Sequence, residues 1–210
     1  MTAQPPGPTD AGPDPADGSP AAPALSPLGV GVVVWLASEL MFFAGLFGAY
    51  FTLRSINSST WPPDDVELAV ARTGVATLVL VASSFTMHLA VHAVRHGGGP
   101  AARRRAVTWL GVTALLGALF LTNQVLEYAE AGFAIDDHAY GSIFYLMTGF
   151  HGLHVLGGLV FMGAVAWMVR SARDGADLVP ATPTVEVCSY YWHFVDVVWV
   201  AMFATIYLLQ

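Results

Sequence analysis

The sequence predicts an all-α, polytopic membrane protein: a bundle of five transmembrane helices with its N-terminus inside and its C-terminus outside. Of the 210 residues, 55% are hydrophobic and only 11% are charged, whereas a soluble domain usually carries about 25% charged residues. The mean hydropathy is +0.59. Five apolar runs follow one another, and each is long enough to cross the hydrocarbon core, for which about 20 residues suffice.

Residues 1–27 differ in composition from the rest of the chain. They hold eight of the 13 prolines, three aspartates and no basic residue. This composition predicts a disordered tail, because it offers too little apolar surface to bury. A signal peptide is not expected, since the positively charged start is absent. The transmembrane domain is therefore predicted to comprise residues 28–210.

The predicted spans are residues 28–53, 70–94, 107–126, 140–169 and 187–209. The breaks between them contain proline and glycine in three places, namely residues 61–63, residues 97–100, and Pro180 with Pro183. Such residues favour turns and chain stops. Six of the eight arginines lie in the second and fourth loops. The positive-inside rule therefore places these loops, and the N-terminus with them, on the inner side.

Composition also excludes several classes of function. A net charge of −7 offers no basic face to nucleic acid. The single cysteine, Cys188, excludes an internal disulfide, a Cys-x-x-Cys-His haem attachment and a multi-cysteine metal site. The loops are too short to hold a soluble catalytic domain, so function is expected inside the bundle.

A mid-depth layer of polar residues is the first candidate site. Glu39 lies about 11 residues into the first span, which is about 16 Å deep. A carboxyl group there is costly unless it is protonated or paired. His151 and His154 lie at a similar depth in the fourth span, and their spacing of three puts both on one face. We expect Glu39 to meet one of these histidines.

A second polar layer is expected nearer the inner side, from His193 and Asp196 in the fifth span and His88 and His92 in the second. Both layers are compatible with hydrogen bonding between helices and with a proton pathway. The histidine pairs of the second and fourth spans differ in depth, which disfavours a haem held between them. Copper or zinc needs three or four convergent ligands, so no metal site is predicted.

Other residues are expected to have structural roles. Glu127 and Tyr128 end the third span and are interpreted as anchors at the outer interface. Glycines let transmembrane helices approach closely. Those predicted to do so are Gly45, Gly48, Gly149, Gly152, Gly157 and Gly158.

Three stretches of the sequence are similar to a known family. They are "SELMFFAGLFGAYF", "EYAEAGFAIDDHAYGSIFYLMTGFHGLHVLGG" and "YYWHFVDVVWVAMFATIYLL", and they resemble subunit III of haem–copper terminal oxidases of the cytochrome c oxidase type. The three follow in the same order as in the family, and the resemblance covers residues 28–210. The chain matches the five-helix bacterial form, which lacks the first two helices of the seven-helix form.

The resemblance implies a subunit without haem or copper of its own. It would contact catalytic subunit I directly, together with subunit II and other subunits of the respiratory complex, and hold phospholipid. It would stabilise subunit I and support its proton uptake, while the complex in the bacterial plasma membrane transfers electrons from cytochrome c to O2. Glu39 corresponds to the family's intramembrane glutamate, His151 and His154 to its Gly-Phe-His-Gly-Leu-His run, and His193 and Asp196 to its Tyr-Trp-His-Phe-Val-Asp run. None of these is a catalytic residue.

Alternatives remain open at this point. The chain could be the equivalent subunit of a quinol oxidase or a nitric oxide reductase. A proton-coupled transporter would also use intramembrane glutamate and histidine, although the inverted repeat of many transporters is absent. A bis-histidine haem protein is disfavoured by the difference in depth.

Overall fold

A computed structural model describes residues 27–63, 66–171 and 178–209, and these form helices joined by short loops. The helices are α1 (Pro27–Ile56), α2 (Val70–His96), α3 (Gly99–Glu130), α4 (Ala139–Ser171) and α5 (Leu178–Phe203), followed by a π-helical turn, η1 (Ala204–Leu208). Five helices in this part of the chain are long and apolar enough to cross a membrane. The predicted all-α, five-span class is confirmed. The predicted tail lies outside the described residues, apart from Pro27.

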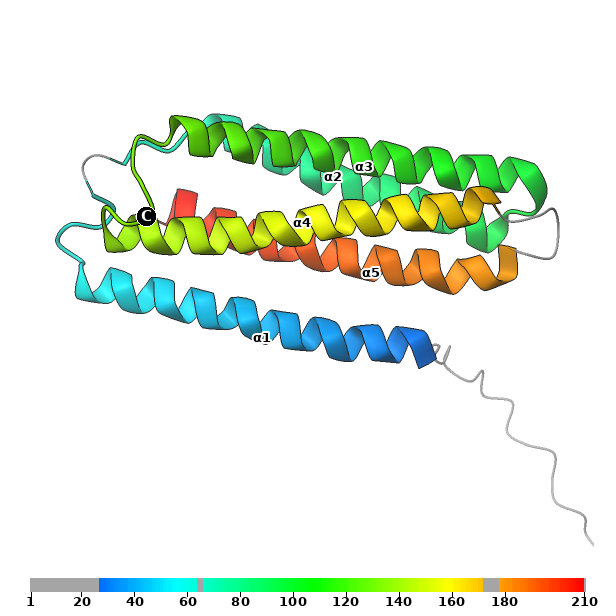
Figure 1. Ribbon diagram of the computed structural model, residues 1–210, viewed down its shortest axis with the longest axis horizontal. Coiled ribbons are helices and arrows are strands. Elements are labelled where there is room, and N and C mark those ends of the chain that lie inside the picture. Colours follow the sequence, from blue (N-terminus) through cyan, green and yellow to red (C-terminus); the bar gives the residue numbers. More distant parts are fainter. Residues whose placement is uncertain (1–26, 64–65, 172–177, 210) are drawn as a thin grey trace, which may run out of the picture.

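The helices run along one another as an elongated bundle (Figure 1). α5 packs against α1, α2 and α4, and α3 packs against α2 and α4. α1 lies along one side of the bundle, where its main contacts are with α4 and α5. The start of α1 and the turn η1 lie at opposite ends of the bundle. α4 also packs against three helices, but α5 has the largest buried share of the five spans, so we call it the central element.

Two helices begin earlier than the apolar pattern predicts. α3 starts at Gly99 rather than at residue 107, and α5 starts at Leu178 rather than at residue 187. The interpretation of Pro180 and Pro183 as stop signals is wrong, since both lie inside α5. Pro180 is the third residue of α5, and the first four N–H groups of a helix have no partner within it, so proline is tolerated there. Pro183 is the sixth residue and lies beyond these four, inside the helix.

Two tryptophans of α5 organise the core. Trp192 and Trp199 are fully buried, and their indole N–H groups donate to Ser83 Oγ and Thr77 Oγ1 of α2, each at 2.8 Å. Each ring thus fills apolar space while its polar atom is satisfied. A Cβ added to Gly117 would lie 2.5 Å from the ring of Trp192. Only glycine lets α3 approach this ring so closely.

Candidate functional site

Glu39 of α1 and His154 of α4 meet at mid-bundle, as their depths predict. The carboxyl Oε2 lies 3.2 Å from Nε2 of His154, and both side chains are partly buried. The other ring nitrogen, Nδ1, lies 2.7 Å from the carbonyl oxygen of Phe150. Because a carbonyl oxygen only accepts, Nδ1 carries a hydrogen.

This tautomer limits what the pair can do. Nε2 of His154 either accepts a hydrogen bond from a protonated Glu39, or carries a second proton and donates it to the carboxylate. The same proton thus has two positions along one hydrogen bond. The pair can hold a proton at mid-depth without leaving an unpaired charge in the hydrocarbon.

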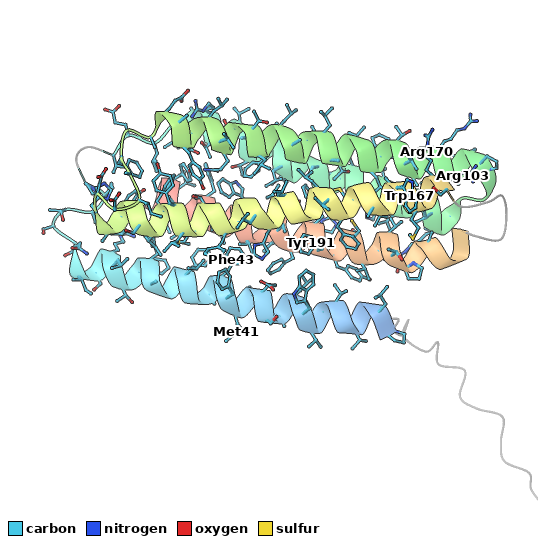
Figure 2. The ribbon with its side chains drawn as sticks, in the orientation of Figure 1. Met41, Phe43, Arg103, Trp167, Arg170 and Tyr191 are labelled. Carbon is cyan, nitrogen blue, oxygen red and sulfur yellow. The ribbon has the colours of Figure 1, made fainter. Side chains whose placement is uncertain are left out.

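Aromatic rings surround the pair on the α1 side of the bundle. Phe43 contacts the ring of His154, with centroids 5.0 Å apart. Trp35 stacks on Tyr191 of α5 at 5.4 Å, and the Tyr191 hydroxyl donates to the carbonyl oxygen of His154 at 2.9 Å. Figure 2 shows Phe43 on the bundle side of α1 and Met41 pointing away from it. These contacts attach α1 to α4 and α5.

His151 does not join this pair, so the expectation that both histidines share one face is wrong. Its Nε2 donates to the carbonyl oxygen of Val195 at 3.2 Å, and its ring packs on Trp199 and Phe120. Residues three apart on a helix differ by about 60° in direction. That angle turns His151 into the core between α3 and α5, while His154 faces α1.

His193 and Asp196 are joined through a residue that the sequence did not single out. Ser84 Oγ of α2 donates to Oδ2 of Asp196. Since its one hydrogen is used, its oxygen accepts from Nδ1 of His193 at 2.9 Å. The sequence feature that could have pointed to Ser84 is its position four residues before His88 on an otherwise apolar helix.

Glu127 is a buried centre of hydrogen bonds, and its interpretation as an interfacial anchor is wrong. It is only 2% exposed. It accepts from Thr73 Oγ1 at 3.1 Å, from Tyr207 OH at 2.9 Å and from Gln124 Nε2 at 3.4 Å. The bundle buries it because η1 turns Tyr207 towards α3. Tyr128, half-buried, hydrogen-bonds Thr148 of α4 at 2.7 Å.

The six glycines fall into two groups. An added Cβ would lie 2.9 Å from Trp192 at Gly158 and 3.3 Å from Tyr191 OH at Gly157, but at an ordinary 3.6 Å and 3.8 Å from the nearest atom at Gly152 and Gly149. At Gly45 and Gly48 it would meet no atom of residues 27–63, 66–171 or 178–209 within 4 Å. The prediction that the α1 glycines pack helices together is therefore wrong within this chain, because they lie on its outer face.

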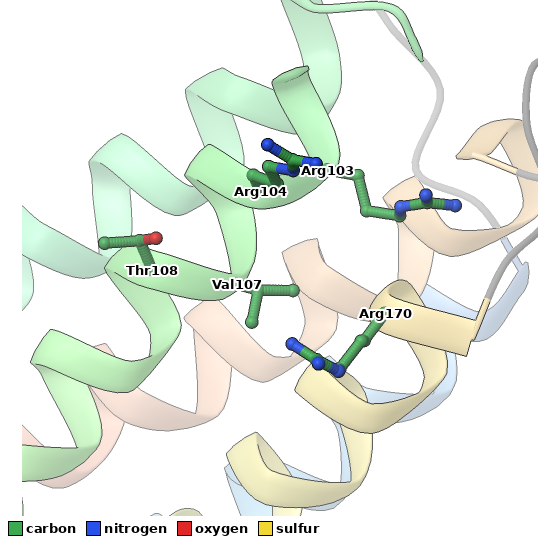
Figure 3. Close-up of a pocket in the computed structure, with 5 residues that line it drawn as sticks. All are labelled: Arg103, Arg104, Val107, Thr108 and Arg170. Atoms are coloured by element: carbon green, nitrogen blue, oxygen red, sulfur yellow. The ribbon is translucent and has the colours of Figure 1, made fainter. Parts of the chain in front are cut away.

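A basic hollow lies where α3 begins and α4 ends. It has a volume of about 430 Å³ and is lined by Arg103, Arg104, Val107, Thr108 and Arg170. Figure 3 shows the three arginines arranged around it from the two helices. Elsewhere, no cluster of three or more His, Cys, Asp or Glu side chains could hold a metal ion within residues 27–63, 66–171 and 178–209.

Comparison with known proteins identifies the family. The family model for cytochrome c oxidase subunit III matches residues 16–210. The chain belongs to the cytochrome c oxidase subunit III family. The match starts upstream of residue 28, where the resemblance by motif began. A probable cytochrome c oxidase subunit 3 of Nocardia farcinica is 46% identical over 184 residues, covering 86% of this chain and 87% of the relative.

Cytochrome c oxidase subunit 3 of Corynebacterium diphtheriae is 44% identical over 188 residues, covering 86% and 87% of the two chains. That of Thermostichus vulcanus is 38% identical over 180 residues, covering 86% of each. This subunit III is thus an accessory subunit of a haem–copper oxidase, an oxidoreductase complex, and a multi-pass membrane protein.

Proposed function

We propose that this subunit contacts and stabilises catalytic subunit I of a proton-pumping cytochrome c oxidase and supports its proton uptake, without a redox centre of its own. The observation that carries the proposal is the Glu39–His154 pair, which can hold one proton at mid-depth in two positions. A purely structural bond between α1 and α4 would not need two ionisable groups in hydrocarbon, where each is costly.

The first experiment tests whether the chain carries haem. The tagged chain is purified in mild detergent, and reduced-minus-oxidised spectra are recorded before and after its partners are stripped away. We expect haem absorbance that leaves with the partners. Haem that stays with the isolated chain would contradict a subunit without a redox centre, and no haem in either sample would contradict assembly with subunit I.

A second experiment separates a proton-holding role from a structural one. Glu39→Gln keeps the size and a hydrogen bond to His154 but cannot exchange the proton, whereas Glu39→Ala removes both. We expect both variants to assemble and to lose oxidase activity several-fold faster than the unmodified complex during sustained turnover. If Glu39→Gln survives turnover as well as the unmodified complex, Glu39 has a structural role only.

Cytochrome c is the proposed electron donor, because the relatives that match most of this chain are named cytochrome c oxidase subunit 3. The purified complex is expected to consume O2 with reduced cytochrome c. Consumption with a quinol alone would assign the complex to quinol oxidases instead.

We also propose a bacterial plasma-membrane location with the arginine-rich end of the bundle inside, and a phospholipid at the basic hollow. Guanidinium groups bind phosphate in bidentate fashion, and basic pockets between transmembrane helices suit lipid headgroups. Trp167, three residues before Arg170, is highly exposed beside this end of the bundle, as expected of a residue at the membrane interface.

The lipid proposal has a matched control. Arg104→Gln combined with Arg170→Gln removes two charges from the hollow, whereas Arg105→Gln removes an exposed charge that does not line it. Mass spectrometry of lipid retained by the purified complex should show loss of anionic phospholipid only in the double variant. Equal retention in both would contradict a site at this hollow.

A further inference from the structure

The lipid-facing surface of the bundle differs sharply in polarity between helices. The exposed face of α4 is apolar over about four turns, through Leu153, Leu156, Val160 and Trp167. On α1, exposed Ser38 and Thr52 donate to carbonyl oxygens of their own helix, so their hydroxyls are satisfied. Both faces are suited to contact lipid.

The surface between α2 and α5 is different. Ser84, His88 and His92 recur every four residues and therefore share one face of α2. Their neighbours on α5 are His193 and Asp196, both joined to Ser84. We call these five residues the α2/α5 seam. Arg95 of α2 and Glu186 of α5 close its end with an ion pair of 2.6 Å.

The seam lies inside the membrane rather than at its edge. α2 has 27 residues, so it is about 40 Å long and extends about 5 Å beyond each side of a 30 Å core. His88 lies eight residues before its end, which is about 7 Å inside the hydrocarbon, and Ser84 lies near the middle. Yet His88 is exposed on this chain. An ionisable side chain at such depth is expected to face protein or water rather than lipid.

A hollow beside the seam has an unsatisfied acceptor in its wall. It measures about 250 Å³ and is lined by Val81, Ser84, Asp196, Val197 and Val200. Asp196 is only 6% exposed. One of its carboxyl oxygens accepts from Ser84, while Oδ1 has no hydrogen-bond partner among the residues that the structure describes. A buried polar atom left unpaired costs about 1–3 kcal/mol, so this arrangement is suited to a donor from outside.

We infer that the α2/α5 seam is the docking surface for a transmembrane helix of the catalytic subunit, one that presents hydrogen-bond donors at the depth of Asp196. The valines of the hollow fit the apolar flank of such a helix, and the carboxyl and imidazole groups fit its polar side chains. A lipid tail fills the same space but leaves Oδ1 unpaired. The inference rests on the proposed function only for the identity of the partner.

Two valines of equal exposure test the inference. Val197 lines the hollow, and Val160 lies on the apolar face of α4; each is 68% exposed. Val197→Trp should lower the haem that co-purifies per tagged chain at least fivefold, because the larger ring fills the docking surface. Val160→Trp should leave it unchanged. Equal haem in the two variants overturns the inference. The haem that co-purifies with the unmodified chain tests the proposed function separately, because it shows whether the partner carries haem.

A cross-linking measurement covers the case in which Val197→Trp fails to accumulate in the membrane. Val197→Cys and Val160→Cys are labelled with a benzophenone maleimide in intact membranes; the native Cys188 is buried and serves as the background control. Irradiation should join position 197 to the haem-bearing subunit and position 160 to lipid. Attachment of position 197 to lipid alone would show that lipid occupies the seam and would overturn the inference.

Discussion

α1 and α5 are both long apolar helices, yet they occupy opposite roles in the bundle. Of the most apolar stretch of α1 only 6% is buried inside the chain, against 56% for α5. α5 is the less apolar of the two. Apolar character therefore places a helix in the membrane but does not place it in the core. Large rings with satisfied polar atoms, set against glycines of neighbouring helices, distinguish the central helix.

The largest expected difference between the two helices comes from their tryptophans. Trp192 of α5 is fully buried, and Trp35 of α1 is 45% exposed. Trp192→Ala should lower the free energy of unfolding by about 3–5 kcal/mol, as expected for a buried aromatic residue. Trp35→Ala should cost about 0.5–1.5 kcal/mol, the value of one stacked pair. Near-ultraviolet circular dichroism across a denaturing-detergent titration measures both; equal losses would contradict the central role of α5.

Glycines provide the next test. Gly158→Val places its Cβ 2.9 Å from the ring of Trp192, and such overpacking costs about 1–3 kcal/mol. Gly45→Val meets open space and should change the free energy of unfolding of the isolated subunit by less than about 0.5 kcal/mol. If Gly45→Val is as damaging as Gly158→Val, α1 packs more tightly than the structure indicates.

Glu127 tests how the end of α5 is fixed. Glu127→Gln replaces an oxygen that accepts from Tyr207 or Thr73 by an amide that donates. Hydrogen bonds between helices in a membrane average about 0.6 kcal/mol and reach about 1.7, so we expect a loss of about 1–2 kcal/mol. Hydrogen exchange at η1 should rise while exchange at α1 stays constant. Unchanged exchange at η1 would show that Glu127 does not hold this turn.

The sequence predicted the five spans because apolar length is a local property. It also predicted that Glu39 meets one of the histidines of the fourth span, because they lie at mid-depth and an unpaired carboxyl group is costly there; the structure shows that His154 is the one. It did not predict the burial of Glu127, since this depends on η1 turning Tyr207 towards it. Ser84 was missed because serine is unremarkable until Asp196 and His193 stand opposite it.

Two predictions, for the histidines of the fourth span and the glycines of the first, were wrong because they did not account for the direction in which each residue points from its helix. His151 and His154 were placed on one face, although a spacing of three turns the side chains about 60° apart, enough to face different neighbours. Gly45 and Gly48 recur among the small residues of α1, as Gly149, Gly152, Gly157 and Gly158 do in α4. Which face of a helix meets another helix of the same chain depends on how the helices are arranged in the bundle. Residue spacing within one helix does not give that arrangement.

The smallest expected effect concerns the bond that joins α1 to α4. In a double-mutant cycle of Glu39→Ala and His154→Ala, each of which removes the bond, a bonded pair should give a coupling free energy of about 0.6–1.7 kcal/mol. A cycle of Glu39→Ala with Tyr50→Phe is the control. Tyr50 fastens α1 to the carbonyl oxygen of Thr205, three turns away from Glu39, so these changes should add within about 0.5 kcal/mol. If the control cycle gives as large a coupling free energy as the Glu39–His154 cycle, α1 packs against the bundle as one rigid unit. The helix would then be attached more firmly than its small buried fraction indicates.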